Sequence, residues 1–209
     1  MENIEFDSRE EFYMYHWLDE MCDVGRILEF EKCQEPFPIC EKQFFNWNKQ
    51  MKTKIKEVQI PICQPQTYLP DFRIKWNPQY EGEFYMNHNG VYSEKCIFLA
   101  IDHESFIDVK GTFFGKHSSD VRFSIKQSLF LSKHNKYVQK IMPLSSHNEN
   151  SKKIGLFEET FCPEQYLIDP ENIYKRGNRK GTSKIKFQTK TVNEYFHITS
   201  PTDAAGGMG

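Results

Sequence analysis

The sequence lacks the cysteine patterns of a zinc protein or a disulfide-stabilised scaffold. Its six cysteines form no C-x-x-C pair, and none has the spacing to histidine that a structural zinc site requires. A chain of 209 residues, 38% of them hydrophobic, is long enough to bury a core without such staples. We therefore expect one domain of ordinary size, with reduced thiols as in proteins of the cell interior.

Long hydrophobic runs and a strong net charge are also lacking. The longest apolar run, CIFLAI, has six residues, whereas a membrane-spanning helix needs about 20. The stretch MENIEFDSRE is acidic and polar, unlike a signal peptide. A net charge of -2 provides no general attraction to nucleic acid, so any basic surface must be local. We expect a cytoplasmic protein that does not contact membranes, located in the host cytoplasm if a phage encodes it.

A helix is predicted near the start of the chain. In FDSREEFYMYHWLDEMC, Ser8 is followed three residues later by Glu11, which is the spacing of a capping box, and apolar residues then recur at helical intervals. Residues 30–66 are broken by four prolines and give a weaker pattern. Within them, FFNWNKQMK is compatible with a turn of helix and KIKEVQIPI is typical of a strand.

The remaining pattern predicts an α/β fold. Two more strands, TYLPDFRIKW and SFIDVKGTFF, enclose an expected hairpin insertion near residues 77–100. A second helix, DVRFSIKQSLFLSKH, capped by Ser118 or Ser119, and the strand KYVQKIMPL follow, and SSHNENSKK is expected to be a loop. The order helix, three strands, helix, strand predicts a mixed sheet flanked by helices. We expect a core at 1–145, a basic extension at 146–200 and a flexible tail at 201–209.

Three charged residues lie inside the two apolar strands: Asp71 in the first, and Asp108 and Lys110 in the second. Two carboxylates that converge repel each other unless a cation lies between them. Oxygen ligands favour Mg²⁺ or Mn²⁺, which neutralise charge during displacement at phosphorus. Lys110 is on the strand face of Asp108, because side chains repeat every two residues, and its ammonium suits a phosphate.

At these residues the sequence resembles a known family. Pro70–Asp71 and the DVKG stretch at 108–111 resemble the PD-(D/E)XK nuclease superfamily, and FDSREE is similar to the helix opening of its phage-type and transposon-type members. The resemblance covers residues 5–142 and implies a restriction-endonuclease-like core that hydrolyses phosphodiester bonds. It also implies a metal site with Mg²⁺ or Mn²⁺ and these site residues: Glu11, Asp71, Asp108, the Val109 carbonyl and the catalytic Lys110.

Several assignments stay open at this point. Glu10 is the alternative to Glu11, because a capping carboxylate cannot easily bind metal as well. Asp102 and Glu104 are the alternatives to Asp71, which is far from Asp108 in sequence. In the second helix, Lys126 or Gln127 is expected to reach the site, although both are equally typical of a solvent-facing helix surface. The open positions are therefore Glu10, Asp102, Glu104, Lys126 and Gln127.

The last third of the chain contains one basic run. IYKRGNRKGTSKIKFQTK carries seven Lys or Arg residues and no acid. Such a run is expected to contact the phosphates of DNA, with Lys175, Arg176, Arg179 and Lys180 as candidate residues. The alternative is a solvated hairpin.

Taken together, the residues and the resemblance predict a Mg²⁺-dependent DNA endonuclease for phage-type DNA processing or recombination. Branched DNA is a candidate substrate. A homodimer with an interface formed by residues 30–66, or a larger DNA-processing complex, would present two active sites to it. The alternative is a catalytically degenerate nuclease-fold module that binds DNA or protein. A third reading is an unrelated α/β binding protein.

Overall fold

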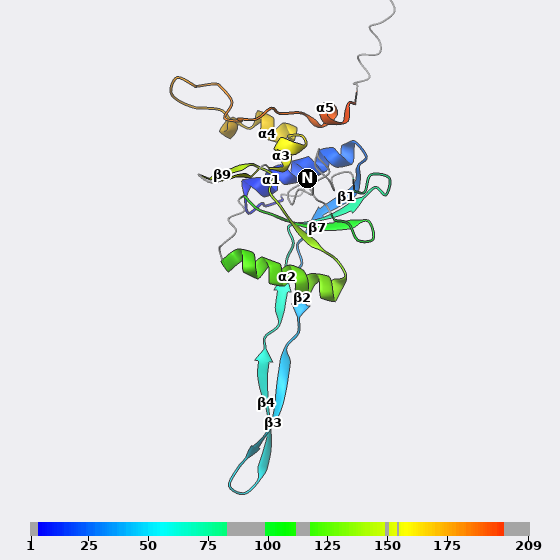
Figure 1. Cartoon of the computed structure of the whole chain (residues 1–209), viewed down its shortest axis with the longest axis vertical. Coiled ribbons are helices and arrows are strands. Elements are labelled where there is room, and N and C mark those ends of the chain that lie inside the picture. Colours follow the sequence, from blue (N-terminus) through cyan, green and yellow to red (C-terminus); the bar gives the residue numbers. More distant parts are fainter. Residues whose placement is uncertain (1–3, 83–98, 112–117, 149–150, 154, 199–209) are drawn as a thin grey trace, which may run out of the picture.

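The computed structural model describes residues 4–82, 99–111, 118–148, 151–153 and 155–198. The chain forms a compact body from which one long two-stranded ribbon projects (Figure 1). Within the described part of the chain, no helix is both long and apolar enough to cross a membrane.

A mixed four-stranded sheet forms the centre of the body. Its strands lie in the order β1 (Ile27–Lys32), β6 (Phe72–Trp76), β7 (Glu104–Val109) and β8 (Val138–Ile141). β6 pairs antiparallel with both β1 and β7, whereas β8 runs parallel to β7. Two helices, α1 (Arg9–Asp23) and α2 (Ser118–His134), lie on opposite sides of this sheet (Figure 1). The expected mixed α/β architecture is therefore confirmed.

Hydrophobic periodicity explains the two layers of core. On α1 the side chains of Tyr13, Trp17 and Met21 recur every four residues and are at most 1% exposed. They pack against alternate residues of β6, Phe72 and Ile74, in one cluster. The opposite sheet face forms a second cluster under α2, built from Phe106, Phe130, Val138, Tyr68 and Ile39.

The ribbon corrects two predictions for residues 30–66. FFNWNKQMK is not helical, because β3 (Gln43–Gln50) spans most of it. KIKEVQIPI does form a strand, β4 (Ile55–Cys63), but β4 pairs with β3 outside the central sheet. The first strand of the sheet is instead β1, which the sequence pattern did not reveal. Its alternating charges, in ILEFEK, are typical of an edge strand that is exposed on one side.

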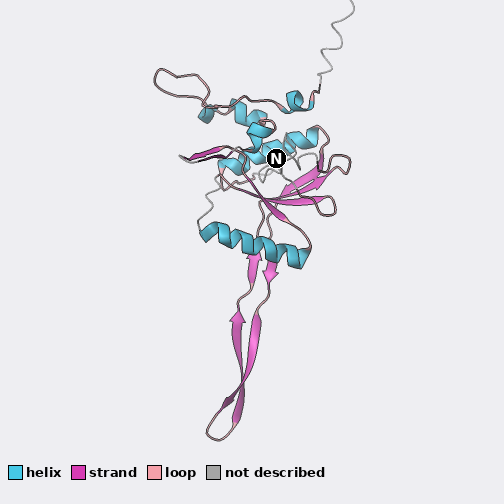
Figure 2. Ribbon diagram, viewed as in Figure 1, coloured by secondary structure: helices cyan, strands magenta, loops and turns pink. Residues whose placement is uncertain are grey.

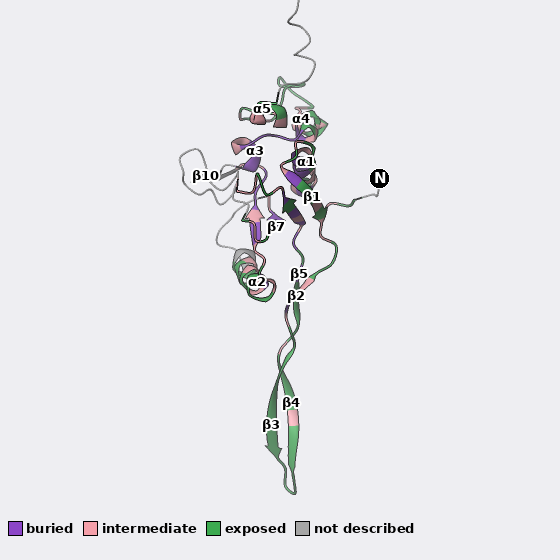
Figure 3. Cartoon of the chain, turned by 90° about the vertical axis from the view of Figure 1, so that its right-hand side faces the viewer, coloured by how far each residue is buried: buried purple, intermediate pink, exposed green. Residues whose placement is uncertain are grey.

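A short root connects the ribbon to the body. β2 (Phe37–Cys40) pairs with β5 (Gln66–Tyr68), and the Sγ atoms of Cys40 and Cys63 lie 3.2 Å apart near this junction. The ribbon extends beyond α2, and nearly all of it is exposed (Figures 2 and 3). The expected hairpin near 77–100 falls largely on residues 83–98, outside the described residues.

Short elements follow the central sheet. β9 (Ser146–Asn148) and β10 (Ser151–Lys153) form a two-stranded sheet where a loop was expected, so that prediction was wrong. Next come α3 (Leu156–Glu159), α4 (Glu164–Ile168), the 3₁₀ turn η1 (Pro170–Asn172) and α5 (Val192–Phe196).

The C-terminal third contributes to the first core cluster. Phe161 is fully buried and stacks on Trp17 of α1, with ring centroids 5.1 Å apart. Tyr166 of α4 meets Tyr13 of α1 edge to face at 4.9 Å. The outer side of α1 is therefore covered by residues beyond 145, although the proposed division of the chain at 145 stays a prediction.

This packing has a measurable consequence for stability. Phe161→Ala is expected to lower the free energy of unfolding by about 3–5 kcal/mol, because it leaves a cavity beside Trp17. Ile168→Ala is the matched control: Ile168 is 57% exposed, so its loss should change stability by about 0.5 kcal/mol or less. Urea unfolding of both variants measures the difference. Equal effects would show that the C-terminal third is not part of the core.

Candidate active site

Asp71 and Asp108 lie side by side where the pairing of β6 and β7 ends. Phe72 pairs with Ile107, so the antiparallel register carried one residue further places Asp71 opposite Asp108. The amide of Asp71 donates to the Ile107 carbonyl at 2.9 Å, and Asp71 Oδ2 accepts from the Val109 amide at 2.5 Å. The long sequence separation of the two acids is thus closed by strand pairing.

The two carboxylates disturb each other. Burial, and next the negative charge of Asp108, raise the pKa of Asp71 to about 7. Asp108 is itself only 5% exposed. A buried pair of acids at neighbouring positions is a source of electrostatic strain that a cation relieves.

Lys110 is the first positive charge at this pair. It follows the end of β7, and its Nζ donates to Asp108 Oδ1 at 2.7 Å. Burial lowers its pKa, but the charge of Asp108 and their hydrogen bond outweigh burial, so the net shift is upward. The side chain is 42% exposed, which gives its ammonium access to a ligand from solvent.

Glu11 approaches the pair from the start of α1. The Ser8 hydroxyl accepts from the Glu11 amide at 3.1 Å, so Ser8 caps the helix as predicted. The Glu11 carboxylate accepts from Lys32 Nζ at 2.8 Å and, at 3.4 Å, from the Asp7 amide and the Ser8 hydroxyl, and only 6% of the residue is exposed. Its charge contributes to the raised pKa of both Asp71 and Lys110, which places it near them.

Glu10 lies on a different side of the same strand end. Its Oε1 is 2.9 Å from the point that a Cβ atom on Gly111 would occupy. The glycine after Lys110 therefore leaves room for the Glu10 side chain. The electrostatic contacts favour Glu11 as the helix carboxylate of the site, and both residues remain close to it.

The other two acids lie at the opposite end of β7. Glu104 forms an ion pair with Lys136 at 2.8 Å and also pairs with Arg73. Asp102 lies 3.5 Å from the same lysine and is exposed. Asp71, rather than Asp102 or Glu104, is therefore the neighbour of Asp108.

The structure adds two residues that the sequence did not reveal. One is Lys32, the partner of Glu11 at the end of β1. The other is Tyr68, which is 8% exposed and whose hydroxyl has no hydrogen-bond partner among the described residues. Burial, followed by the charge of Asp108, raises the pKa of Tyr68, so the hydroxyl is near that carboxylate without making a hydrogen bond of ordinary geometry. The only sequence signal for Tyr68 was its place three residues before Asp71.

The two candidate site residues on α2, Lys126 and Gln127, make different contacts. Gln127 Nε2 donates to the Val138 carbonyl at 2.5 Å, which ties α2 to β8. Lys126 Nζ instead lies over the ring of Tyr68, 5.6 Å from its centroid. Lys126 is thus the α2 residue that is directed toward the site.

The donor chemistry suits a hard cation, but the acids do not form a three-ligand cluster. Among the described residues, no group of three or more His, Cys, Asp or Glu side chains is arranged to hold a metal ion. One oxygen of each acid is turned to its own N–H or ammonium partner. Asp71 and Asp108 fit a divalent cation as a pair, since both offer carboxylate oxygen at one point of the sheet. Glu11 and the Val109 carbonyl as further ligands stay predictions.

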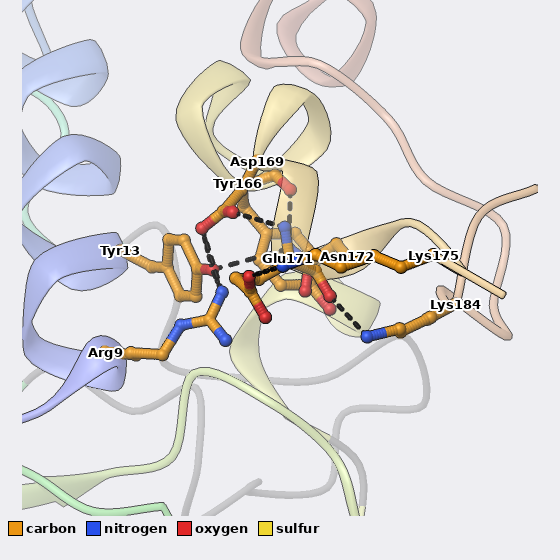
Figure 4. A network of polar contacts seen from close by, with 8 residues as sticks. All are labelled: Arg9, Tyr13, Tyr166, Asp169, Glu171, Asn172, Lys175 and Lys184. Carbon is orange, nitrogen blue, oxygen red and sulfur yellow. Dashed lines mark hydrogen bonds and ion pairs between the residues drawn. The ribbon is translucent and has the colours of Figure 1, made fainter. Parts of the chain in front are cut away.

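The basic run of the C-terminal third is anchored to the helix that carries Glu11. Tyr13 and Arg9 both donate to Asp169 Oδ2, at 2.6 and 2.9 Å (Figure 4). Asn172 then donates to the Tyr166 carbonyl at 2.8 Å, and Lys184 Nζ donates to the Glu171 carbonyl at 2.7 Å. These contacts fix the base of the basic loop relative to α1.

Four candidate DNA-binding residues lie in this loop. Lys175 is paired with Glu171. The exposed side chains of Arg176, Arg179 and Lys180 are paired with no carboxylate among the described residues. Within the described part of the chain these three positive charges thus lack an acidic partner, and Arg179 lies over the Tyr174 ring, 5.9 Å from its centroid.

Comparisons of this chain with protein-family models, with curated proteins and with solved structures find no match. The assignment of function therefore rests on the residues of this chain and their geometry.

The repulsion at the acid pair predicts a pH-dependent stability. The folded-state pKa of Asp71 is raised to about 7, above its unfolded value of about 3.9. Its contribution to stability is therefore fully present below about pH 4 and is lost as pH rises through about 7. Asn keeps an oxygen for the Val109 amide without the charge. In chelator, Asp71→Asn should gain a few degrees in Tm over wild type as pH rises, at about 2–4 °C per kcal/mol.

Scanning calorimetry across this pH range measures the effect. Asp102→Asn is the control, because Asp102 lies near the opposite end of β7 from the acid pair, so its substitution should not reproduce the gain of Asp71→Asn. An advantage of Asp71→Asn that shrinks as pH rises would contradict the assigned repulsion.

Proposed function

We propose that this chain is a metal-dependent DNA endonuclease of the PD-(D/E)XK type. The observation that carries the proposal is the position of Asp71 beside Asp108, one residue beyond the Phe72–Ile107 pair, with Lys110 Nζ donating to Asp108 at 2.7 Å. The element order α1, β1, β6, β7, α2, β8 supports it, since it has the helix, three strands, helix, strand order of a restriction-endonuclease-like core. The acid pair, the lysine and the order agree with the resemblance in residues 5–142.

Each residue has a separate role in this proposal. Asp71 and Asp108 hold Mg²⁺ or Mn²⁺, with Glu11 completing the acidic set. When bound, the cation supplies charge neutralisation at the scissile phosphate and lowers the pKa of coordinated water. Lys110 orients the scissile phosphate and stabilises the negative charge that develops there, because its ammonium is both close to Asp108 and accessible to solvent. Lys126 places a further positive charge beside Tyr68.

A specific observation favours a second candidate, a nuclease-fold module without activity that binds DNA or protein. Glu11 is held in an ion pair with Lys32, and the described acids do not converge as a three-ligand site. We rank this candidate second, because Asp71, Asp108 and Lys110 are all present and Lys110 forms an ion pair with Asp108. Phage-type DNA processing, a branched substrate, a homodimer and a cytoplasmic location remain parts of the proposal.

Cleavage of supercoiled plasmid tests catalysis. Mg²⁺ or Mn²⁺ should support nicking, and excess chelator or replacement by Ca²⁺ should abolish it, because Ca²⁺ has looser geometry and affects bound water less. Asp108→Ala should lower the cleavage rate by about a thousandfold or more, since a metal contributes several kcal/mol to such a reaction. Binding of DNA should survive. Glu104→Gln, at the other end of β7, is the matched control and should cleave normally. Full activity in chelator would refute the metal mechanism.

Binding titrations at three salt concentrations test the basic loop. Replacing Arg176, Arg179 and Lys180 by alanine should weaken binding to every DNA sequence alike. It should also lower the slope of log affinity against log salt by about two to three units, about one for each lost phosphate contact. Lys175→Ala is the control, because Lys175 is already paired with Glu171 and should lower the slope less than any one of the three. An unchanged slope in the triple variant would identify the run as a solvated hairpin.

A further inference from the structure

The projecting ribbon has no role in the site described above. We call β3, β4 and the turn between them, residues 43–63, the arm. The turn is closed by a hydrogen bond from the Met51 amide to the Lys54 carbonyl at 2.8 Å. An isolated two-stranded ribbon is only marginally stable in water, and the arm stands clear of the body (Figures 1 and 3). A ribbon of this kind is suited to lie against a partner.

Strand register gives the arm two different faces. Residues directly opposite each other on paired strands share a face. One face carries the apolar pairs Phe45–Ile60 and Trp47–Val58 and, toward the tip, the pair Lys49–Lys56. The other face begins at the root with Phe44 opposite Pro61. It continues toward the tip with side-chain amides: Asn46 opposite Gln59, Asn48 opposite Glu57, and Gln50 opposite Ile55. A row of Asn and Gln on an exposed ribbon is a hydrogen-bonding surface.

The tip of the arm is positively charged. Lys49 lies directly opposite Lys56, and like charges in that position destabilise a ribbon. Lys52 and Lys54 lie in and beside the turn. No carboxylate of the described residues pairs with any of these four lysines, and Glu57 is the one acid between residues 42 and 63. In a chain of net charge -2, this unpaired cluster points to an anionic partner.

Both ends of the arm lead directly into the candidate site. The chain enters the root just after Lys32, the partner of Glu11, and returns through Tyr68 and Asp71. The amide of Cys33 donates to the Asp71 carbonyl at 3.0 Å, so the entry and exit of the arm meet at the acid pair. The root of the arm therefore lies beside the acid pair, and the ribbon leads away from it, beyond α2 (Figure 1).

We propose that the arm binds duplex DNA, with the four tip lysines on phosphates and the amide face along base edges in the major groove. A two-stranded ribbon fits a groove about 12 Å wide, and Asn and Gln pair with adenine there. The eight residues of β3 span about 27 Å, which is somewhat less than the about 34 Å of one turn of B-DNA. The inference rests on the proposed function in one respect, that the protein acts on DNA. It does not depend on the cleavage reaction.

A second copy of this chain is the competing occupant, because the apolar face would suit it. Two arms packed together through Phe45 and Trp47 would bring two lysine clusters toward each other without an acid to neutralise them. Phosphates neutralise the same lysines and leave the amides paired with bases. Charge complementarity therefore favours the duplex.

Duplex binding by the full-length protein in chelator tests this inference without cleavage. Lys49, Lys52, Lys54 and Lys56 are replaced together by glutamine, and by arginine in a matched variant that keeps the charge. The glutamine variant should bind at least about tenfold more weakly near physiological salt, with a slope against log salt lower by about three units. The arginine variant should retain both. Equal Tm values and circular dichroism spectra establish that the body is intact.

A second pair of substitutions tests the amide face. Asn46→Ala with Gln59→Ala should leave the salt slope unchanged but reduce the difference in affinity between duplexes of different sequence, since amides read bases and lysines do not. A glutamine variant with wild-type affinity and slope would overturn the inference. If the arm is needed to bind single-stranded DNA but not duplex DNA, the choice of duplex is wrong.

Sedimentation velocity distinguishes the competing occupant. If Phe45→Ser with Trp47→Ser converts a dimer to a monomer and the lysine variant binds DNA normally, the arm is a self-association surface and the inference fails. Failure of the proposed function is recognised separately. In that case wild type binds duplex through the arm but does not nick plasmid with Mg²⁺, and the inference about the arm stands.

Discussion

The register between β6 and β7 is the constraint on which the candidate site depends. A shift of one residue would move every side chain of a strand to the opposite face of the sheet, and Asp71 would no longer face Asp108. Fully buried Phe72 and Ile107 hold the register, because they are paired with each other and belong to the core cluster under α1. The Asp71 amide donates to the Ile107 carbonyl, and the Asp71 carbonyl accepts from the Cys33 amide. These two hydrogen bonds continue the same register to the acid itself.

The same strand rule produces two like-charge pairs in very different settings. Asp71 and Asp108 are adjacent carboxylates within the body, whereas Lys49 and Lys56 are adjacent ammoniums at the exposed tip of the arm. Neither pair is favourable for folding on its own. The proposed function and the proposed role of the arm supply each pair with a ligand of opposite charge: a cation for the acids and phosphates for the lysines. The root that carries the arm begins and ends beside Asp71, so in the proposed function one DNA molecule would contact the lysines of the arm and the acids of the body.

Local patterns were sufficient to predict the parts of the structure that local forces determine. The periodicity of α1, its Ser8 cap and the alternation around Asp108 and Lys110 all follow from neighbours in sequence. β1 was missed because an edge strand carries charges where a central strand carries apolar residues. FFNWNKQMK was misread because a ribbon exposed on both faces has no single buried face to set a clear period. The contacts of Lys32, Tyr68 and Gln127 depend on residues brought close only by folding, and no spacing in the sequence encodes them.

Charge balance explains how the site is maintained within the folded body. Of the three acids Glu11, Asp71 and Asp108, two accept a hydrogen bond from an ammonium: Glu11 from Lys32 and Asp108 from Lys110. Asp71 accepts from the Val109 amide instead. An unpaired buried carboxylate is costly, and the raised pKa of Asp71 shows which acid bears that cost. A proton on Asp71 is one way to remove the excess charge, and a divalent cation shared with Asp108 is the other. The Lys32 side chain is 20% exposed and that of Lys110 is 42% exposed. Lys110 is thus the ammonium that can leave its acid for a phosphate at least cost in packing, while Lys32 continues to hold Glu11 in place.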